Sequence, residues 1–211
     1  MGVDISEDYR NIVQPHLLLV EDDEAVGFFD ALIKRWNLND TTIRKIGRGD
    51  EFERNLRILK TEFVKDKLKT IGIVQDAKDN PTATFERIKR TLTNLGDSLP
   101  DSYGHGSSGS PIIHIIILPD GLNSTGGIES LCLRALEGDP VLPCVNGYFE
   151  CLDEREVPYD GLEIDKAKIL VYLASNESIK NLKELASSDV LSLEGTLFDE
   201  IKLFLTSVCN V

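Results

Sequence analysis

Four short stretches rich in apolar or β-branched residues divide the first part of the chain. They are residues 17–20 (LLLV), 41–46 (TTIRKI), 70–74 (TIGIV) and 112–118 (IIHIIIL). Nearly continuous apolar runs of this length are typical of strands that are covered on both faces. After each stretch, apolar residues recur at helical spacing, which predicts four amphipathic helices. These apolar positions run from Ala25 to Trp36, Phe52 to Phe63, Phe85 to Leu95 and Ile128 to Ala135.

This alternation of strands and helices predicts an α/β fold with an open, mainly parallel sheet, helices on both faces and right-handed crossovers. The 211 residues are enough to bury one large core, so we expect a single domain over residues 1–211. Its α/β core is expected to cover residues 16–138, and a mostly helical C-terminal subdomain residues 139–211. Within the C-terminal part, residues 168–175 (KILVYLAS) are compatible with either a strand or a helix.

Three of the predicted strands run into an acidic residue. Glu21 follows the first strand, Asp76 the third, and Asp120 the fourth. The carboxyl ends of parallel strands meet at one edge of a sheet, where ligands bind, so neighbouring strands would bring these carboxylates together. Such a cluster repels itself unless it is protonated or binds a cation, and its hard oxygen ligands suit magnesium or manganese. The sequence therefore predicts a metal site at Glu21, Asp76 and Asp120, with further ligands from nearby Asp79 and Glu129.

Each acid also has a structural interpretation. Asp22 or Asp23 is suited to cap the first helix, Asp79 or Asn80 is placed to cap the third, and Asp120 lies in a PDG turn. Glu21 lies one residue too early to cap a helix that begins near Glu24, which makes it the best single candidate for a catalytic role.

Composition limits the partners and the compartment. There are 36 acidic and 23 basic residues, a net charge of -13, and this opposes strong binding to a polyanion without local contacts, a metal or a partner protein. Four cysteines form no CxxC pair, which argues against structural zinc and fits a reducing compartment. The acidic N-terminus does not resemble a signal peptide, and the longest apolar run, residues 111–119, is too short to span a bilayer. We expect a cytoplasmic protein without membrane partners; the sequence does not indicate the oligomeric state.

The opening letters LLLVEDDE resemble the start of a receiver domain, in which paired acids bind magnesium beside a phosphorylated aspartate. A receiver has a proline four residues after its acceptor aspartate. Here Asp76 is followed at that distance by Asn80, and Pro81 comes one residue later. A receiver-like phosphoacceptor is therefore the third of our hypotheses.

A longer resemblance is to the Toprim domain of topoisomerases, primases and related nucleases, and in particular to its stand-alone uncharacterised branch. It covers about residues 16–150, through the segments LLLVEDDEAVGFFDALIKR, IGRGDEFERNL, IGIVQDAKDNPTATFERIKRTL and ILPDGLNSTGGIESLCLRAL. The resemblance implies a Toprim-like α/β fold and a magnesium or manganese cofactor. It also implies that Glu21 is the family's glutamate and Asp76 the first acid of its DxD pair.

The chain departs from the Toprim pattern at two positions. Asp22 replaces the glycine that usually follows the glutamate, and Lys78 replaces the second acid of the DxD pair. An ammonium group at this position can substitute for the charge of one metal ion.

Two hypotheses lead. The first is a magnesium-dependent nuclease or nucleotidyl transferase that acts on nucleic acid or a nucleotide, with Glu21 as general base or metal ligand. The alternative is a non-catalytic module that keeps the fold and binds a partner protein, a nucleotide or a nucleic acid end.

Overall fold

The computed structural model of the chain describes residues 14–38, 41–61, 68–158 and 163–210. Within these ranges one sheet is present, and its strands are all parallel in the order β2-β1-β3-β4. The strands are β1 (His16–Val20), β2 (Thr42–Lys45), β3 (Thr70–Asp76) and β4 (Ile112–Leu118). All four lie where the apolar stretches of the sequence predict them.

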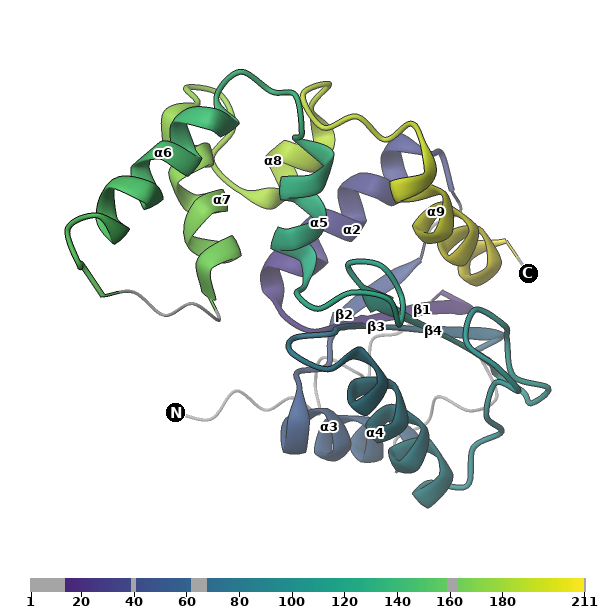
Figure 1. The fold of residues 1–211 in the computed structure, drawn as a ribbon. Coiled ribbons are helices and arrows are strands. Elements are labelled where there is room, and N and C mark those ends of the chain that lie inside the picture. Colours follow the sequence, from purple (N-terminus) through teal and green to yellow (C-terminus); the bar gives the residue numbers. More distant parts are fainter. Residues whose placement is uncertain (1–13, 39–40, 62–67, 159–162, 211) are drawn as a thin grey trace, which may run out of the picture.

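Helices cover both faces of this sheet. They are α2 (Asp23–Arg35), α3 (Gly49–Thr61), α4 (Pro81–Asn94), α5 (Ile128–Ala135), α6 (Leu142–Asp153), α7 (Ile164–Ser175), α8 (Leu182–Ser187) and α9 (Thr196–Cys209). Helices α3 and α4 lie below the sheet in Figure 1, whereas α2, α5, α8 and α9 lie above it. The predicted α/β architecture with a parallel sheet and a helical C-terminal part is thus confirmed.

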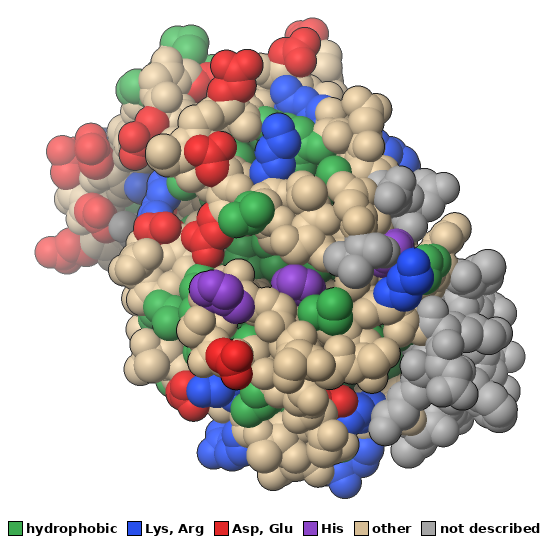
Figure 2. Space-filling model, turned by 90° about the vertical axis from the view of Figure 1, so that its right-hand side faces the viewer, with side chains coloured by type: hydrophobic (Ala, Val, Ile, Leu, Met, Phe, Trp, Pro, Cys, Tyr) green, Lys and Arg blue, Asp and Glu red, His purple; other side chains and the backbone are tan. Residues whose placement is uncertain are grey.

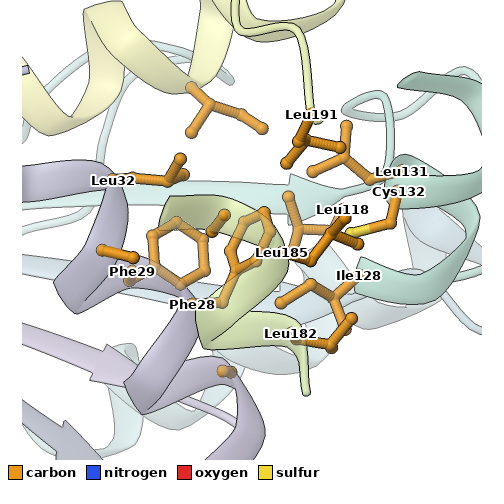
Figure 3. Packing of buried hydrophobic residues seen from close by; sticks show 14 of the residues in the cluster. Phe28, Phe29, Leu32, Leu118, Ile128, Leu131, Cys132, Leu182, Leu185 and Leu191 are labelled. Atoms are coloured by element: carbon orange, nitrogen blue, oxygen red, sulfur yellow. The ribbon is translucent and has the colours of Figure 1, made fainter. Parts of the chain in front are cut away.

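The two faces of the sheet belong to two separate hydrophobic clusters. Side chains alternate between the faces along a strand, so Leu17 and Leu19 pack with α3 and α4, whereas Leu18 and Val20 pack with the other helices. Figure 3 shows the second cluster, in which side chains of α2, α5, α8 and β4 meet. Its labelled members include Phe28, Phe29, Leu32, Leu118, Ile128, Leu131, Leu182 and Leu185.

The C-terminal helices complete this second cluster. Residues 168–175, compatible with a strand or a helix by sequence, lie within helix α7. Helix α8 packs against α2, and α9 packs across the strands of the sheet. The approach of α9 requires Gly72 in β3, because a Cβ atom there would lie 2.8 Å from both Leu18 and Val208 side-chain atoms. The sheet and the C-terminal part therefore share one core.

The described surface offers no extended basic area on the side of the molecule in Figure 2, where acidic, basic and hydrophobic side chains are mixed. No helix in the described ranges is long and apolar enough to cross a membrane.

Candidate functional site

The direction of the strand order reverses between β1 and β3. From β1 the chain crosses to β2 on one side, and from β2 it returns past β1 to β3 on the other side. This reversal makes the carboxyl ends of β1 and β3 the topological switch point, where ligands bind in open parallel sheets. Glu21 directly follows β1 and Asp76 is the last residue of β3, and both residues are 9% exposed.

Glu21 and Asp76 are held by backbone donors from neighbouring segments. The backbone N–H of Asp76 donates to Glu21 Oε2 over 3.2 Å, and the N–H of Ile128 donates to Asp76 Oδ1 over 3.2 Å. Ile128 is the first residue of α5, so the positive end of that helix faces the Asp76 carboxylate. At the preceding Gly127 a Cβ atom would collide with the same carboxylate. Glycine at this position therefore allows α5 to approach Asp76.

The ammonium group of Lys78 lies between the two carboxylates. Its Nζ atom is 2.7 Å from Asp76 Oδ2 and 3.2 Å from Glu21 Oε1. Lys78 has a left-handed backbone with φ +53°, which is uncommon for a residue other than glycine. This conformation is held by hydrogen bonds to Gly126, whose carbonyl accepts from the Lys78 N–H at 2.8 Å and whose N–H donates to the Lys78 carbonyl at 2.6 Å. The backbone thus turns the lysine side chain back towards the strand ends.

A second basic residue, Arg48, approaches the same site from the turn after β2. Its Nη1 atom lies 3.7 Å from Glu21 Oε1, and its side chain is largely exposed. Gly47 and Gly49 flank it with φ values of +79° and +55°, a conformation that glycine adopts without strain. Arg48 is absent from the candidates predicted from sequence, although the GRG triplet was the signal that could have identified it.

Two buried amide side chains hold this turn in place. Asn55 Nδ2 donates to the Ile46 carbonyl over 3.0 Å, and Gln75 Nε2 donates to the Gly47 carbonyl over 2.9 Å. Because two successive carbonyl groups are bound, the backbone that carries Arg48 is fixed beside the strand ends.

The pKa values of Asp76 and Lys78 are both raised, but for different reasons. Burial, with a further contribution from the Glu21 charge, raises the pKa of Asp76 to about 7 even though the Lys78 ammonium acts in the opposite direction. Burial also acts to lower the pKa of Lys78, but the Asp76 and Glu21 carboxylates outweigh it and raise that pKa. Lys78 therefore stays charged at neutral pH, while the surroundings of Asp76 favour the protonated form of its carboxyl group.

Asp120, the third predicted strand-end acid, faces a different environment. Its side chain is 45% exposed, lies 3.7 Å from Arg134 Nη1, and accepts a 3.2 Å hydrogen bond from Ser124 Oγ. Asp79 is exposed. Glu129 lies in the first turn of α5, where burial raises its pKa.

The helix caps follow the structural interpretation of the sequence. Asp22 is the N-cap of α2 and accepts a hydrogen bond from the Ala25 N–H over 2.9 Å. Asn80, rather than Asp79, is the N-cap of α4, and Pro81 occupies the first turn. Asp22 thus has a clear structural role beside the site.

A metal ion has two carboxylate ligands available at this site. In the described part of the chain, no group of three or more His, Cys, Asp and Glu side chains is placed to hold a metal. The structure brings together Glu21 and Asp76, whereas Asp120 binds Arg134. Magnesium in proteins often keeps several waters and only one or two carboxylates, so Glu21 and Asp76 form a sufficient set in number. The Lys78 ammonium, however, occupies the position between them, and the predicted metal-binding roles stay predictions.

One known protein family matches nearly the whole of the described chain. Comparison with curated proteins and with solved structures finds no match. The matching family model spans residues 15–210, which includes the sheet, the Glu21–Lys78–Asp76 cluster and the C-terminal helices. The chain therefore belongs to the family described as "Protein of unknown function (DUF3226)".

Proposed function

We propose that this protein is a Toprim-like module that binds a phosphate monoester, as found in a nucleotide or at a nucleic acid end, without needing a metal. The observation that carries the proposal is the Lys78 ammonium between the Glu21 and Asp76 carboxylates. It supplies positive charge at the position where a cation would bridge these two acids. The site also lies at the switch point of a parallel sheet, and Lys78 has the uncommon backbone conformation that is often found at functional sites.

The cluster has donors left for a ligand. An ammonium group carries three N–H donors, and Lys78 uses two of them on the carboxylates while its side chain remains 46% exposed. Arg48 adds an exposed guanidinium group on the same side of Glu21. Partial protonation of Asp76 near pH 7 reduces the negative charge that would repel a phosphate. Phosphate binding should therefore weaken as the pH rises above about 7.

The test is a calorimetric titration in EDTA at low salt, with adenosine 5′-monophosphate and with a short oligonucleotide that carries or lacks a 5′-phosphate. We expect binding that depends on the phosphate. Lys78→Met should weaken it about 10- to 100-fold, because a hydrogen bond to a charged group contributes ~1.5–3 kcal/mol. Arg134→Met, which removes the partner of Asp120, is the matched control and should leave binding unchanged. Equal binding by the native protein and Lys78→Met would contradict the proposal.

A second candidate function is magnesium-dependent phosphodiester or nucleotidyl chemistry. It is favoured by the raised pKa of Asp76, because a carboxyl group that retains a proton beside an ammonium would gain from further positive charge. In this case Glu21 and Asp76 would hold the ion, and the ion would stabilise charge on the reacting phosphate. Lys78 would have to leave its present position between the carboxylates.

Thermal unfolding in magnesium or manganese separates the two candidates. Under the metal-independent proposal the native protein shows no metal-dependent shift in Tm, whereas Lys78→Asp, which restores an acid two residues after Asp76, gains one. Adding Asp76→Asn to that variant should abolish the gain. A shift in the native protein that disappears in both Glu21→Gln and Asp76→Asn would instead establish the metal-dependent candidate.

A further inference from the structure

Helix α6 lies at the outer margin of the molecule, where it packs mainly against α7 (Figure 1). Its inner face is formed by the buried side chains of Val145 and Phe149. On the opposite face Cys144, Tyr148 and Cys151 are exposed at helical spacing, and Tyr148 is 51% exposed. These three exposed residues form the α6 stripe, a helix face without a charged side chain.

The composition of the α6 stripe is that of an interface rather than of a solvated helix face. Residues 140–149 contain no charged side chain, although 28% of the residues of the chain are charged. Surfaces where proteins contact one another are enriched in aromatic residues and depleted of Lys, Glu and Asp. The outer face of α9 provides the contrast, because its exposed Leu203 lies among the exposed charged residues Asp199, Glu200 and Lys202. A single exposed leucine is ordinary, whereas an exposed stripe of two thiols and a tyrosine indicates a partner.

The α6 stripe matches itself when two copies of α6 are paired antiparallel. The middle of the helix lies between Gly147 and Tyr148, and Cys144 and Cys151 are equally far from it in the sequence. Around a two-fold axis at that point, Cys144 of one copy lies opposite Cys151 of the other, and each Tyr148 lies over the Gly147 of the other copy. No atom lies within 4 Å of a Cβ built at Gly147, so the space above this glycine is open to the tyrosine ring of a second copy.

The distribution of charge along α6 also favours an antiparallel pairing. Its acidic residues, Glu150 and Asp153, lie in the C-terminal half, whereas the N-terminal half is uncharged. In an antiparallel pair each acidic half lies beside the N-terminal half of the other helix, where the helix dipole is positive. A parallel pair would instead bring the two acidic halves together, and their carboxylates would repel each other.

We infer that the α6 stripe is the contact surface for a second copy of this chain, which binds through an antiparallel, two-fold pairing of the two α6 helices. Each α6 has 12 residues, and a pair of such helices buries less than the ~1,200 Å² of a stable interface. Association should therefore be weak, and dilute protein should be monomeric. This inference is independent of the proposed phosphate site, because α6 carries none of the residues of that site.

Sedimentation equilibrium of the full chain under reducing conditions tests the association. We expect a reversible equilibrium between monomer and dimer at protein concentrations up to about 1 mM. Tyr148→Glu places a charge at the centre of the interface and should weaken dimerisation at least about tenfold. Leu203→Glu is the matched control, because it changes a residue of α9 that is 66% exposed, and it should dimerise as the native protein does. A native protein that stays monomeric, or an equal loss in both variants, would overturn the inference.

Oxidation with copper phenanthroline, which removes two electrons and two protons from a pair of thiols, tests the register of the two helices. Cys144 and Cys151 are exposed and the other two cysteines are buried, so we expect a disulfide-linked dimer of the native protein. Neither Cys144→Ser nor Cys151→Ser alone should give the link, because identical cysteines of an antiparallel pair are about 10 Å apart along the helix axis. A mixture of the two variants should restore it. Links within each single variant, or no link in the mixture, would contradict the antiparallel pairing.

Discussion

The ends of β3 and β4 carry the same sequence pattern, an apolar strand followed by an acid, but the two acids are in different environments. Asp76 is nearly buried, receives an N–H from α5 and contacts the Lys78 ammonium. Asp120 is half-exposed and pairs with Arg134 at 3.7 Å. Asp76 therefore has a raised pKa and a constrained geometry, whereas Asp120 forms a surface contact of the kind that contributes little to stability.

Strand order and register explain the difference. β3 lies between β1 and β4, so its end has neighbours on both sides, whereas β4 is at the edge of the sheet. Asp76 is in register with Leu118, so Asp120 comes two residues later, which is about 7 Å further along at the usual rise per strand residue. Glu21 is two residues beyond Leu19, the partner of Ile73, and therefore lies level with the end of β3. An acid after a strand becomes part of a shared site only if the register brings it to the same level as its neighbours.

The pH dependence of stability should show the largest contrast between these acids. A raised pKa means that folded Asp76 keeps a proton that the unfolded chain has lost, so its contribution to the unfolding free energy falls as the pH rises from about 4 to about 7. The limit of this loss is about 4 kcal/mol, at ~1.4 kcal/mol per pKa unit. Urea unfolding over this pH range should show that Asp76→Asn removes the fall, whereas Asp120→Asn keeps it. The same slope in all three proteins would show that Asp76 titrates normally.

Substitution of Gly127 should disturb the buried acid next most strongly. In Gly127→Ala the new methyl group collides with the Asp76 carboxylate, and relief of an overpacked contact costs about 1–3 kcal/mol. The matched control is Gly147→Ala in α6, where no atom lies within 4 Å of the new Cβ and the helix should gain about 0.5–1 kcal/mol. Urea unfolding of both variants measures the difference. Equal stability of the two would mean that α5 can move away from Asp76 without cost.

Removal of the basic partners should give the smallest contrast. At pH 8, Lys78→Met leaves Glu21 and Asp76 without their shared counter-ion, and we expect a loss of about 1–2 kcal/mol because Lys78 itself is half-exposed. Arg134→Met, beside Asp120, should cost less than about 0.5 kcal/mol. Thermal and urea unfolding at pH 8 and pH 5 provide the comparison. The cost of Lys78→Met should shrink at pH 5, since Asp76 is then protonated; a cost that is the same at both pH values would argue against the ammonium as counter-ion.

The spacing of apolar residues was sufficient to predict the strands and the first helices, because that spacing reflects which side chains are buried. The apolar runs that end at Val20 and Leu118 are strands, and the Asn80–Pro81 pair begins a helix. Residues 168–175 stayed ambiguous because a uniformly apolar segment has no clear period; packing against α5 and α6 accompanies its helical form.

The amino-acid sequence by itself determined the alternation of strands and helices and the presence of an acid after three strands, because both are properties of neighbouring residues. It also showed that lysine stands at residue 78, where an acid was expected. Only the tertiary structure decided which acids meet, because strand order, register and the close approach of α5 at Gly127 depend on contacts between distant segments. The same contacts place Lys78 between Glu21 and Asp76, bring Arg48 to their side and leave Asp120 at the edge of the sheet.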